Sequence, residues 1–515
     1  MNDPIELIIP MTGVGQRFVD AGYTTLKPLI QTGIGSMVEG VLSNYPSIKK
    51  PIFIITNTHP QRSSVIEHIK EIRKEARIFE IEAHKKGPGY AVWQIKDKIR
   101  SDIPIVINYC DFSGRWSEEK LLRELGNQHG LILTYSGFHP HMLRSTKFAY
   151  VKKNEDGLVI DIREKSSFTD EPMQEEASSG TYGFRDKETL LSALDMQIKR
   201  DITLNGELYT SLTYLPLIQK GLPIRTMLIE KFFQWGTPED LADFQLWNEI
   251  GINSFEKLPQ KSRNSSTIIL AAGLGTRLPA SEKPKALIPI FSQPLWNYAA
   301  SSVSVCRNRL VVTRQDLQEG IKDSNIFQFQ ILALPFITSG QAETSTYGIN
   351  ILKEKNQPLH IVSCDNIVLG DVLKNIEDMF NAYDIVMWSS SNYAFAKSNP
   401  QHFTWIVREE SNSRVVKKIL FKDAKPPNLA ELFIGNVSFK NGIIAEKLFR
   451  NLFDKGKNMP KREIYIDHII EDALSSATYK VGSFEVKKFA SIGTPLELLT
   501  ARYWEEVYDG NEPKK

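Results

Sequence analysis

Two glycine-rich turns, each followed by basic residues, are the features of this sequence that point most directly to chemistry. Both turns follow an apolar segment and have the pattern G-x-G-x-R, with Gly13, Gly15 and Arg17 in one copy and Gly273, Gly275 and Arg277 in the other. A lysine follows each turn within a second apolar-flanked motif, at Lys27 and at Lys285. Glycines let backbone N–H groups approach a ligand closely, and arginine brings a permanent charge with geometry suited to phosphate. The pattern therefore predicts two phosphate-handling sites.

Further short motifs recur in the same order along the 515-residue chain. They are NYCDF and SCDN, KGPGYAV and SGQAETS, SSGTYGF and IGNVSF, and QWGTPEDL and SIGTPLEL. A repeat of this length indicates a tandem duplication rather than a solenoid. We expect one domain over residues 1–252, a polar linker over 253–265 and a second domain over 266–515, because hydrophobic patterning lapses between the two strongly patterned segments.

The composition, with 41% hydrophobic and 24% charged residues, is that of a globular protein with enough apolar residues for two cores. A formal net charge of +2 provides no basic stripe of the kind that nucleic-acid binding requires. No apolar run approaches the length of a membrane-spanning helix, and MNDPIELIIP lacks the features of a signal peptide. Two of the three cysteines precede the repeated aspartates, which favours small buried side chains over a disulfide framework. We therefore expect a cytoplasmic protein that binds neither nucleic acid nor membrane.

Apolar segments alternate with helical patterns in both halves. The expected strands lie at 5–10, 52–56, 103–108 and 131–135, and near 267–271, 309–313, 359–363 and 384–388, with first-half helices at about 36–45, 61–75 and 88–100. Continuous apolar runs indicate strands covered on both faces, and hence α/β domains with mainly parallel central sheets. Ligands of such sheets bind beyond the carboxyl ends of the strands, where we expect the glycine turns, Asp111 and Asp365.

Three other binding motifs are disfavoured. Neither turn has the third glycine of the dinucleotide-binding pattern G-x-G-x-x-G, and no Lys-Ser or Lys-Thr pair follows as in a P-loop. His139 and His141 form an H-x-H pair without an evident third ligand, so we expect no metal there. A single G-x-G turn is equally consistent with a tight strand-to-helix connection, but its duplication together with the arginine and the lysine is hard to explain by packing.

The segments LAAGLGTR and KPKALIPI closely resemble the nucleotidyltransferases that make sugar nucleotides, the sugar-1-phosphate pyrophosphorylases and related cytidylyltransferases. IPMTGVGQRF, AGYTTLKPLI and FFQWGTPEDL look like the branch of this family often found in surface-polysaccharide biosynthesis. The resemblance covers almost the whole chain as two consecutive family domains, and it implies a Rossmann-like nucleotidyltransferase fold in each. It also implies nucleotidyl transfer from a nucleoside triphosphate to a phosphorylated sugar or polyol, with release of pyrophosphate. CTP or UTP is favoured as donor by resemblance alone.

The resemblance assigns roles to matching positions. Neutralisation of the triphosphate and of the leaving pyrophosphate falls to Arg17, Lys27, Arg277 and Lys285. A magnesium ion, Mg2+, would be held by Asp111 and Asp365. Nucleotide contacts are expected at Gly13, Gly15, Gly87, Gly273, Gly275, Gly340 and Gln341. Acceptor contacts are expected at Lys165, Lys422, Gly180 and Gly435. The acceptor phosphate is largely dianionic at neutral pH, so the reaction requires no general base.

Several of these positions also have a purely structural interpretation. An aspartate after a strand commonly forms a turn or caps a helix. Lys165 and Lys422 are equally consistent with solvated strand ends. The two G-T-P sequences can be helix starts, with Thr237 or Thr494 as the N-cap and proline at the first helical position.

The halves depart from the family pattern in different ways. Members commonly carry a second metal-binding aspartate two residues before the late G-T motif, where this chain has Gln234 and Ser491. The second half has Phe421 where the first has Glu164, before the acceptor lysine. In the glycine-started turn, the first half has Pro88, Tyr90 and Ala91 where the second has Gln341, Glu343 and Thr344. The halves are therefore expected to differ in substrate or in competence.

Two alternatives stay open. In the first, one half is a degenerate nucleotide-binding module that stabilises or regulates the other. In the second, the chain is a glycosyltransferase on a related fold, although CDF and CDN lack the D-x-D that such enzymes typically need. The sequence does not indicate an oligomeric state.

Overall fold

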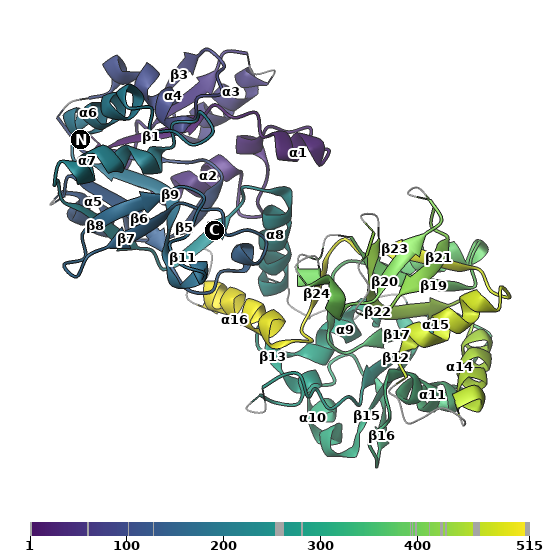
Figure 1. The fold of residues 1–515 in the computed structure, drawn as a ribbon. Coiled ribbons are helices and arrows are strands. Elements are labelled where there is room, and N and C mark those ends of the chain that lie inside the picture. The colour runs from purple at the N-terminus through teal and green to yellow at the C-terminus, as the bar shows by residue number, and fades with distance from the viewer. Residues whose placement is uncertain are drawn as a thin grey trace. The chain divides into compact units, whose positions relative to one another are not determined.

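The computed structural model describes residues 3–509 except 59–60, 101, 127, 253–261, 280–281, 392, 394, 397–398, 411–412, 423–425, 428–429 and 457–463. The chain divides into two compact units, Met1–Glu249 and Ile250–Lys515 (Figure 1). Each unit contains one large sheet with helices packed on it.

The first unit alternates strands and helices. Its large sheet contains β1 (Glu6–Met11), β2 (Ile52–Thr56), β3 (Arg77–Ile81), β4 (Ile105–Asn108), β6 (Gly130–Tyr135), β7 (Tyr150–Lys153), β8 (Val159–Arg163), β9 (Glu176–Phe184) and β10 (Ile224–Leu228). Its helices are α1 (Gln16–Asp20), α2 (Met37–Leu42), α3 (Arg62–Ile72), α4 (Pro88–Gln94), α5 (Glu118–Gly126), α6 (Lys187–Lys199), α7 (Leu215–Gln219) and α8 (Pro238–Ile252). A short antiparallel pair joins β5 (Phe112–Arg115) to β11 (Lys231–Gln234).

The second unit repeats this arrangement. Its large sheet contains β12 (Arg263–Ala271), β15 (Cys306–Arg314), β16 (Gln330–Leu334), β17 (Leu359–Ser363), β19 (Ile385–Ser390), β20 (Trp405–Arg408), β21 (Val416–Leu420), β22 (Glu431–Phe439) and β23 (Val481–Glu485). Its helices include α9 (Leu295–Val303), α10 (Gln318–Asp323), α11 (Gln341–Ile351), α12 (Leu373–Asp378), α14 (Gly442–Gly456), α15 (Ile466–Ser475) and α16 (Pro495–Asp509). Short antiparallel pairs join β13 (Pro289–Ile290) to β14 (Gln293–Pro294), and β18 (Asn366–Val368) to β24 (Phe489–Ser491).

The two large sheets have the same topology. The strand order is β10-β6-β9-β4-β1-β2-β3 in the first and β23-β19-β22-β17-β12-β15-β16 in the second, when both are followed from the same edge. Neighbouring strands in these orders are parallel except where β9 or β22 pairs with them. The predicted α/β class with mainly parallel sheets is therefore confirmed, and the single antiparallel strand near the centre of each sheet is an addition that the sequence analysis did not make.

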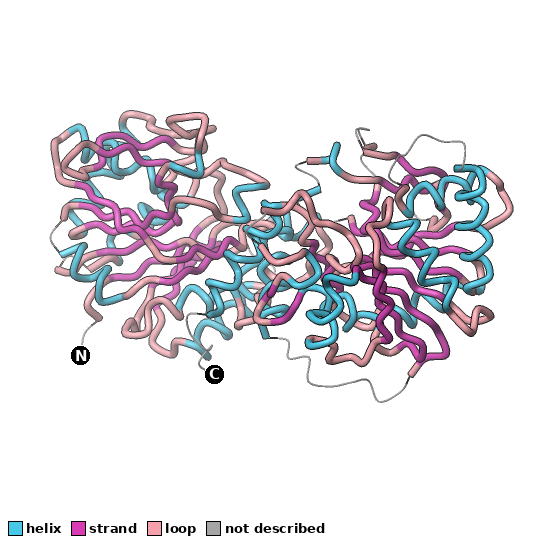
Figure 2. The backbone as a smooth tube through the Cα atoms, turned by 90° about the horizontal axis from the view of Figure 1, so that it is seen from below, coloured by secondary structure: helices cyan, strands magenta, loops and turns pink. Residues whose placement is uncertain are grey.

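Continuous apolar strands form because both faces of each sheet are covered. All six residues of β1 are buried, and alternate residues belong to different cores: Leu7 and Ile9 pack on one face, Ile8 on the other. In β12 the same division separates Ile269 from Ile268. Figure 2 shows the strands of each unit gathered into a layer with helices outside it. This double burial is what a parallel sheet with crossover helices requires.

The element boundaries differ from the expectation at the seam between the units. The interval expected as a linker, residues 253–265, lies mostly outside the described residues, but β12 already begins at Arg263. Arg263 is held there by its backbone N–H, which donates to the carbonyl of Val305, and by a side-chain ion pair with Glu377 at 3.0 Å. The polar sequence around Arg263 concealed this first part of the strand.

Among the described residues, no helix combines the length and the apolar character that crossing a membrane would demand.

Candidate active site

Each unit has a cleft at the carboxyl ends of its first and fourth large strands. In the first unit, a cleft of about 1130 Å³, open solvent included, is lined by residues that include Gly13, Gly15, Lys27, Gly87 and Asp111. In the second unit, a cleft of about 850 Å³ is lined by residues that include Arg277, Gln341, Asp365, Lys422 and Gly435. Most of the predicted site residues thus lie at the edge of the sheet where ligands of such folds bind.

The second glycine of each turn packs directly on the lysine that follows. Gly15 and Gly275 have φ of 68° and 67°, in the left-handed region that favours glycine. A Cβ added at Gly15 would lie 3.1 Å from the Cβ of Lys27, and one added at Gly275 would lie 3.1 Å from the Cβ of Lys285. Glycine is therefore required here for two reasons, the backbone conformation and the close approach of the lysine. Nothing lies within 4 Å of the Cβ positions of Gly13 and Gly273, which leaves those backbones open to a ligand.

Both lysines pair with the aspartate that follows the fourth large strand. The Nζ of Lys27 lies 2.7 Å from Oδ2 of Asp111, and Lys285 forms the equivalent ion pair with Asp365. Burial disfavours the charged form of Lys27, but the facing Asp111 outweighs it and raises the pKa of the lysine above its ordinary value. Burial acts against the charged carboxylate of Asp365 too, yet Lys285 and hydrogen bonding hold its pKa below the ordinary value. Lys27 and Asp365 are therefore charged at neutral pH.

The arginines of the two turns lie at their outer ends and are exposed. Arg277 lines the second cleft. Arg17, in α1, is not among the residues that line the first cleft, but its charge is near enough to Lys27 to oppose slightly the rise in the pKa of that lysine. Arg17 therefore adds positive charge to the first cleft from its rim, whereas Arg277 is part of the cleft wall.

Each aspartate is fixed by the late G-T motif of its unit. The backbone N–H of Trp235 donates to the carbonyl of Asp111 at 3.0 Å, and that of Ile492 donates to the carbonyl of Asp365 at 3.0 Å. The strand pairs β5–β11 and β18–β24 bring these distant segments together. The motif also starts a helix, since the Asp240 N–H donates to Thr237 Oγ1 at 3.1 Å. The helix-cap interpretation of the motif is therefore confirmed, and in the second unit Gly493 and Thr494 also line the cleft.

A buried glutamate that the sequence analysis missed lies beside the aspartate of the second cleft. Glu497 is 4% exposed, lines the cleft and accepts hydrogen bonds from the Gly493 N–H at 2.8 Å and from Tyr393. Burial, together with the charge of Asp365, raises the pKa of Glu497. The matching residue in the first unit, Asp240, is instead paired with Arg144 at 3.0 Å. Both units have an acidic residue four positions after the glycine of the G-T motif, and this repeat could have identified Glu497 from the sequence.

Gly87 and Gly340 immediately precede the helices α4 and α11, as the predicted turn requires. A Cβ at Gly87 would come within 2.9 Å of the backbone of Leu208, so no larger residue fits there. The side chains after the two glycines differ as expected, and Gln341 lines the second cleft. The first cleft receives His84 from the segment before its glycine instead.

The two lysines predicted to bind the acceptor each lie over a tyrosine ring that the sequence analysis missed. Lys165 Nζ is 4.5 Å from the ring centroid of Tyr209 and hydrogen-bonds its hydroxyl, and Lys422 Nζ is 4.5 Å from the centroid of Tyr465. Tyr209 lines the first cleft, and Lys422 and Tyr465 line the second. Lys165 has a φ of 59°, which is unusual for a residue with a side chain. The signal was the triplet E-x-Y, present at 207–209 and 463–465.

The two glycines of the predicted acceptor segment occupy equivalent places in β9 and β22, with φ of 95° at Gly180 and 82° at Gly435. A Cβ at Gly180 would lie 3.2 Å from the ring of Tyr109, which lines the first cleft. A Cβ at Gly435 would have no atom within 4 Å, and Gly435 lines the second cleft. The first cleft is therefore closed at this point by an aromatic ring, and the second is open.

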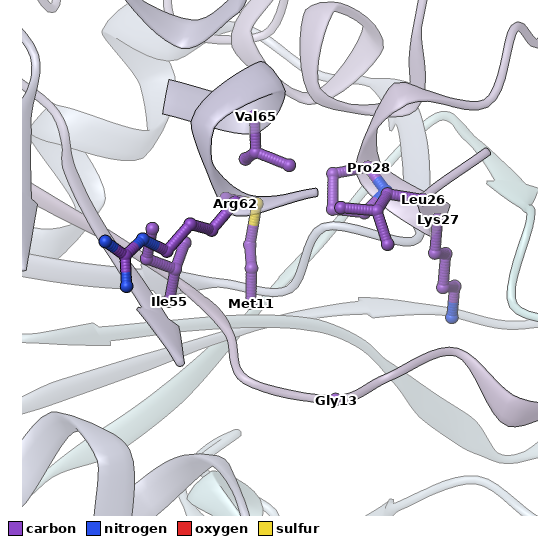
Figure 3. Close-up of a pocket in the computed structure, with 8 residues that line it drawn as sticks. All are labelled: Met11, Gly13, Leu26, Lys27, Pro28, Ile55, Arg62 and Val65. Carbon is purple, nitrogen blue, oxygen red and sulfur yellow. The ribbon is translucent and has the colours of Figure 1, made fainter. Parts of the chain in front are cut away.

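An arginine reinforces the second glycine turn, and the first turn has no equivalent. Arg314 donates from Nη1 to the carbonyl of Gly273 at 2.9 Å. The register of β1 with β2 and of β12 with β15 places Thr56 at the corresponding position of the first unit. A small pocket remains beside the first turn, and Figure 3 shows Met11, Ile55 and Val65 on one side of it and Lys27 on the other.

Two sequence features are structural. The histidine pair of the first unit is buried, with His141 hydrogen-bonded to Tyr135 at 3.0 Å, and burial lowers the pKa of His139 to about 4. The three cysteines are free, and burial raises the pKa of Cys110 and Cys364 to about 12, so neither thiol is an activated nucleophile.

The residues around Asp111 and Asp365 fit a divalent ion that keeps most of its own water ligands. Within the described ranges, no group of three or more histidine, cysteine, aspartate or glutamate side chains is placed to hold a metal. Asp111 or Asp365 lies close to the glycine turn of its unit, Glu497 adds a second carboxylate to the wall of the second cleft, and the side chain of Asp111 is 31% exposed. Such a set fits a hydrated Mg2+ that arrives bound to phosphate oxygens, because Mg2+ keeps several waters and needs few protein ligands.

Residues 7–222 match the model of the nucleotidyl transferase family, and no curated protein matches the chain. A nucleoside-diphosphate-sugar pyrophosphorylase from Vibrio cholerae RC9 is similar at 23% identity, over 46% of this chain and 99% of its own, with a TM-score of 0.40. A candidate glucose-1-phosphate thymidylyltransferase from Bacillus anthracis, in complex with sucrose, is 18% identical over 49% of this chain and 98% of its own, with a TM-score of 0.39. Most of the first unit, residues 7–222, thus matches the nucleotidyl transferase family, and the second unit repeats the strand order and the sequence motifs of the first.

Proposed function

We propose that each unit is an independent domain that transfers a nucleotidyl group from a nucleoside triphosphate to a phosphorylated sugar or polyol and releases pyrophosphate. One observation carries the proposal. In both units a left-handed glycine packs on a lysine, and that lysine pairs with an aspartate at the end of the fourth large strand. A duplicated packing motif does not need its charged groups at the mouth of a cleft, whereas a duplicated phosphate site does.

The chemistry follows from these charges. An oxygen of the acceptor phosphate attacks the α-phosphorus of the triphosphate, the bond from that phosphorus to the β-phosphate bridging oxygen breaks, and pyrophosphate leaves with the electron pair. Lys27 has three donors, of which Asp111 uses one, so the others can bind the triphosphate and the leaving group. The open backbone at Gly13 supplies N–H groups. Catalysis then rests on positioning and charge neutralisation.

The acceptor is bound by the lysine and tyrosine pair of each unit. Lys165 and Lys422 each provide a cation for the acceptor phosphate, with a tyrosine ring beneath it. Because the attacking phosphate is already largely ionised at neutral pH, no side chain has to remove a proton. Asp111 and Asp365 would hold Mg2+, which supplies further neutralisation of the phosphate oxygens when bound.

The resemblance of the glycine turns and of FFQWGTPEDL supports more specific features of the proposal. The donor is CTP or UTP, the product supplies activated precursors for surface polysaccharide, and the reaction takes place in the cytoplasm. Gln341 is the base-reading side chain of the second cleft, which it lines. The first cleft reads its base by other groups, because Pro88 occupies that position.

The test is pyrophosphate release by the full-length protein with the four triphosphates, Mg2+ and a panel of sugar and polyol phosphates. We expect Lys27→Ala to abolish one activity and Lys285→Ala the other, with Lys50→Ala, an exposed lysine of the first unit, as the control. If either change alone removes all turnover, the two-enzyme proposal is wrong. If only one of the two changes has any effect, the unaffected unit is the degenerate module. Release of a nucleoside diphosphate from a nucleotide sugar would instead support the glycosyltransferase alternative.

A further inference from the structure

The second cleft lacks the acidic residue that precedes the acceptor lysine, but a different element supplies a carboxylate there. In the first unit this residue is Glu164, and the hydroxyl of Ser211 donates to its Oε2 at 2.6 Å. The positions of Glu164 and Ser211 therefore face each other. Counting from the acceptor lysine and from the tyrosine beneath it, the same two positions in the second unit hold Phe421 and Asp467. The carboxylate thus follows strand β8 in the first unit, whereas in the second unit it lies at the start of helix α15.

The surroundings of both second-unit residues have changed accordingly. The ring of Phe421 stacks on His468, with centroids 5.0 Å apart and planes 25° apart. Phe421 therefore packs against the first turn of α15. Asp467 is 7% exposed and lines the second cleft together with Lys422 and Tyr465. A buried carboxylate at the wall of a cleft is costly unless it serves a partner.

A third position, next to those of Phe421 and Asp467, also differs between the two units. Oγ1 of Thr404 donates to Oδ2 of Asp467 at 2.7 Å. The pairing of β7 with β9 and of β20 with β22 makes Ala149 the corresponding residue of the first unit. The first unit thus combines Glu164, Ser211 and Ala149, and the second combines Phe421, Asp467 and Thr404. The threonine hydroxyl is therefore present in the second unit, where the carboxylate lies at the start of α15, and is replaced by alanine in the first.

We propose that Asp467, oriented by Thr404, is the specificity-determining carboxylate of the second acceptor site, where it accepts hydrogen bonds from hydroxyl groups of the acceptor close to its phosphate. This inference rests on the proposed transfer reaction and adds the chemistry that the second site recognises. Among the described residues, Oδ1 of Asp467 accepts from the backbone N–H of His468 at 3.0 Å and lies 3.3 Å from Nδ1 of its ring, whereas Oδ2 accepts from Thr404. A carboxylate oxygen accepts more than one hydrogen bond, so Oδ2 can also accept from a hydroxyl of the acceptor. The nearby Lys422 binds the phosphate, so the two groups together select a phosphate monoester whose neighbouring carbons carry hydroxyls.

The structural alternative is that Asp467 only stabilises the start of α15, where an acidic residue is favourable. That role would be the same with or without substrate, and it does not require a hydroxyl donor such as Thr404, which immediately precedes β20. The two interpretations predict different kinetic behaviour, so substrate kinetics separate them.

The experiment uses the full-length protein and defines the second-site reaction as the pyrophosphate release that Lys285→Ala removes. The acceptor panel is glucose 1-phosphate, ribitol 5-phosphate, glycerol 3-phosphate and phosphocholine, which has no hydroxyl group on its carbons. We expect turnover with a hydroxyl-bearing acceptor and none with phosphocholine. Asp467→Asn should raise the acceptor KM roughly 10- to 100-fold, the range expected for hydrogen bonds to a charged group, and leave the KM of the triphosphate unchanged.

A rescue variant guards against a simple folding defect. Asp467→Ser alone should behave like Asp467→Asn, and adding Phe421→Glu and Thr404→Ala, which recreates the set of the first unit, should lower the acceptor KM again. The proposal is overturned if Asp467→Asn leaves the acceptor KM unchanged while turnover continues, or if phosphocholine is the preferred acceptor. If the unaltered protein shows no second-site turnover, the proposed function fails, and calorimetric binding of the same four acceptors then decides: equal affinity in Asp467→Asn refutes this inference, and a selective loss supports it.

Discussion

The Nζ of Lys27 lies 2.7 Å from Oδ2 of Asp111, and this contact joins the residue that opens a short helix after the glycine turn to the one that follows β4. The same link exists between Lys285 and Asp365. In each unit this ion pair holds the lysine next to the aspartate before any substrate is present.

Replacement of the aspartate tests this link. Asp111→Asn should lower first-site turnover about 10²- to 10³-fold, the cost usually found when one group that stabilises developing charge is lost. Second-site turnover should be unchanged, because Asp365 is intact. Steady-state pyrophosphate release measures both, with Asp20→Asn, on exposed α1, as the control. Equal turnover in Asp111→Asn and the unaltered protein would remove Asp111 from the mechanism.

The glycine-on-lysine contact predicts a second effect. Gly15→Ala places a Cβ in a left-handed conformation, which costs roughly 1–2 kcal/mol, and also 3.1 Å from the Cβ of Lys27. Gly22→Ala is the matched control, since Gly22 has φ of 86° and nothing within 4 Å. Both variants should lose similar stability in urea unfolding, but only Gly15→Ala should lose first-site activity. Equal activity losses would show that strain, rather than lysine placement, matters.

The support of the second turn by Arg314 predicts a third effect. Arg314→Leu removes the donor to the carbonyl of Gly273, so the turn should hold the triphosphate less well. We expect the triphosphate KM at the second site to rise about tenfold, consistent with one lost hydrogen bond from a charged donor, and the acceptor KM to stay constant. Arg309→Leu is the control, because Arg309 lies on the same strand but bonds the carbonyl of Ser304. A rise in the acceptor KM alone would contradict this role.

The ion pair of Asp240 with Arg144 predicts a pH dependence of stability. Burial raises the pKa of Asp240 to about 6, although Arg144 opposes the shift, whereas the unfolded value is about 3.9. Between these values the folded protein binds more protons than the unfolded chain, so this contribution is present below about pH 4 and is lost as the pH rises through about 6. The loss is on the order of 1–3 kcal/mol.

Urea unfolding from pH 4 to 7, followed by tryptophan fluorescence, measures this contribution. The difference in unfolding free energy between the unaltered protein and Asp240→Asn should fall as the pH rises. A difference that stays constant or increases over this interval would contradict the assignment. Glu497→Gln is a useful comparison, because burial raises the pKa of Glu497 in the same direction without an arginine partner.

The fold followed closely from hydrophobic patterning. Segments such as 52–56 and 359–363 coincide with β2 and β17, because continuous apolar residues identify strands buried on both faces. Strand direction was less accessible. The residues of β9 and β22 are almost all buried, as in the parallel neighbours, although β9, with the sequence EASSGTYGF, is much richer in small and polar residues. Only the pairing registers show that these two strands run antiparallel.

The site was predictable where residue type and spacing recur together. Lys27, Asp111 and their counterparts were identified because each stands in a repeated motif. Arg314 and Glu497 were not, because their roles depend on which backbone or side chain they meet in the folded unit. Asp467 was missed for a related reason: a carboxylate moved from a strand end to a helix start leaves its expected position empty in any motif alignment.

The pairing of β5 with β11 affects when each site becomes complete. Asp111 is fixed by the N–H of Trp235, which lies close to the end of the first unit, so the first site cannot form until nearly all of that unit has been synthesised. The described residues that line the first cleft all precede α8, however. As domains generally fold as units and in N-terminal order during translation, the first site can be assembled on the ribosome while the second half of the polypeptide is still being made.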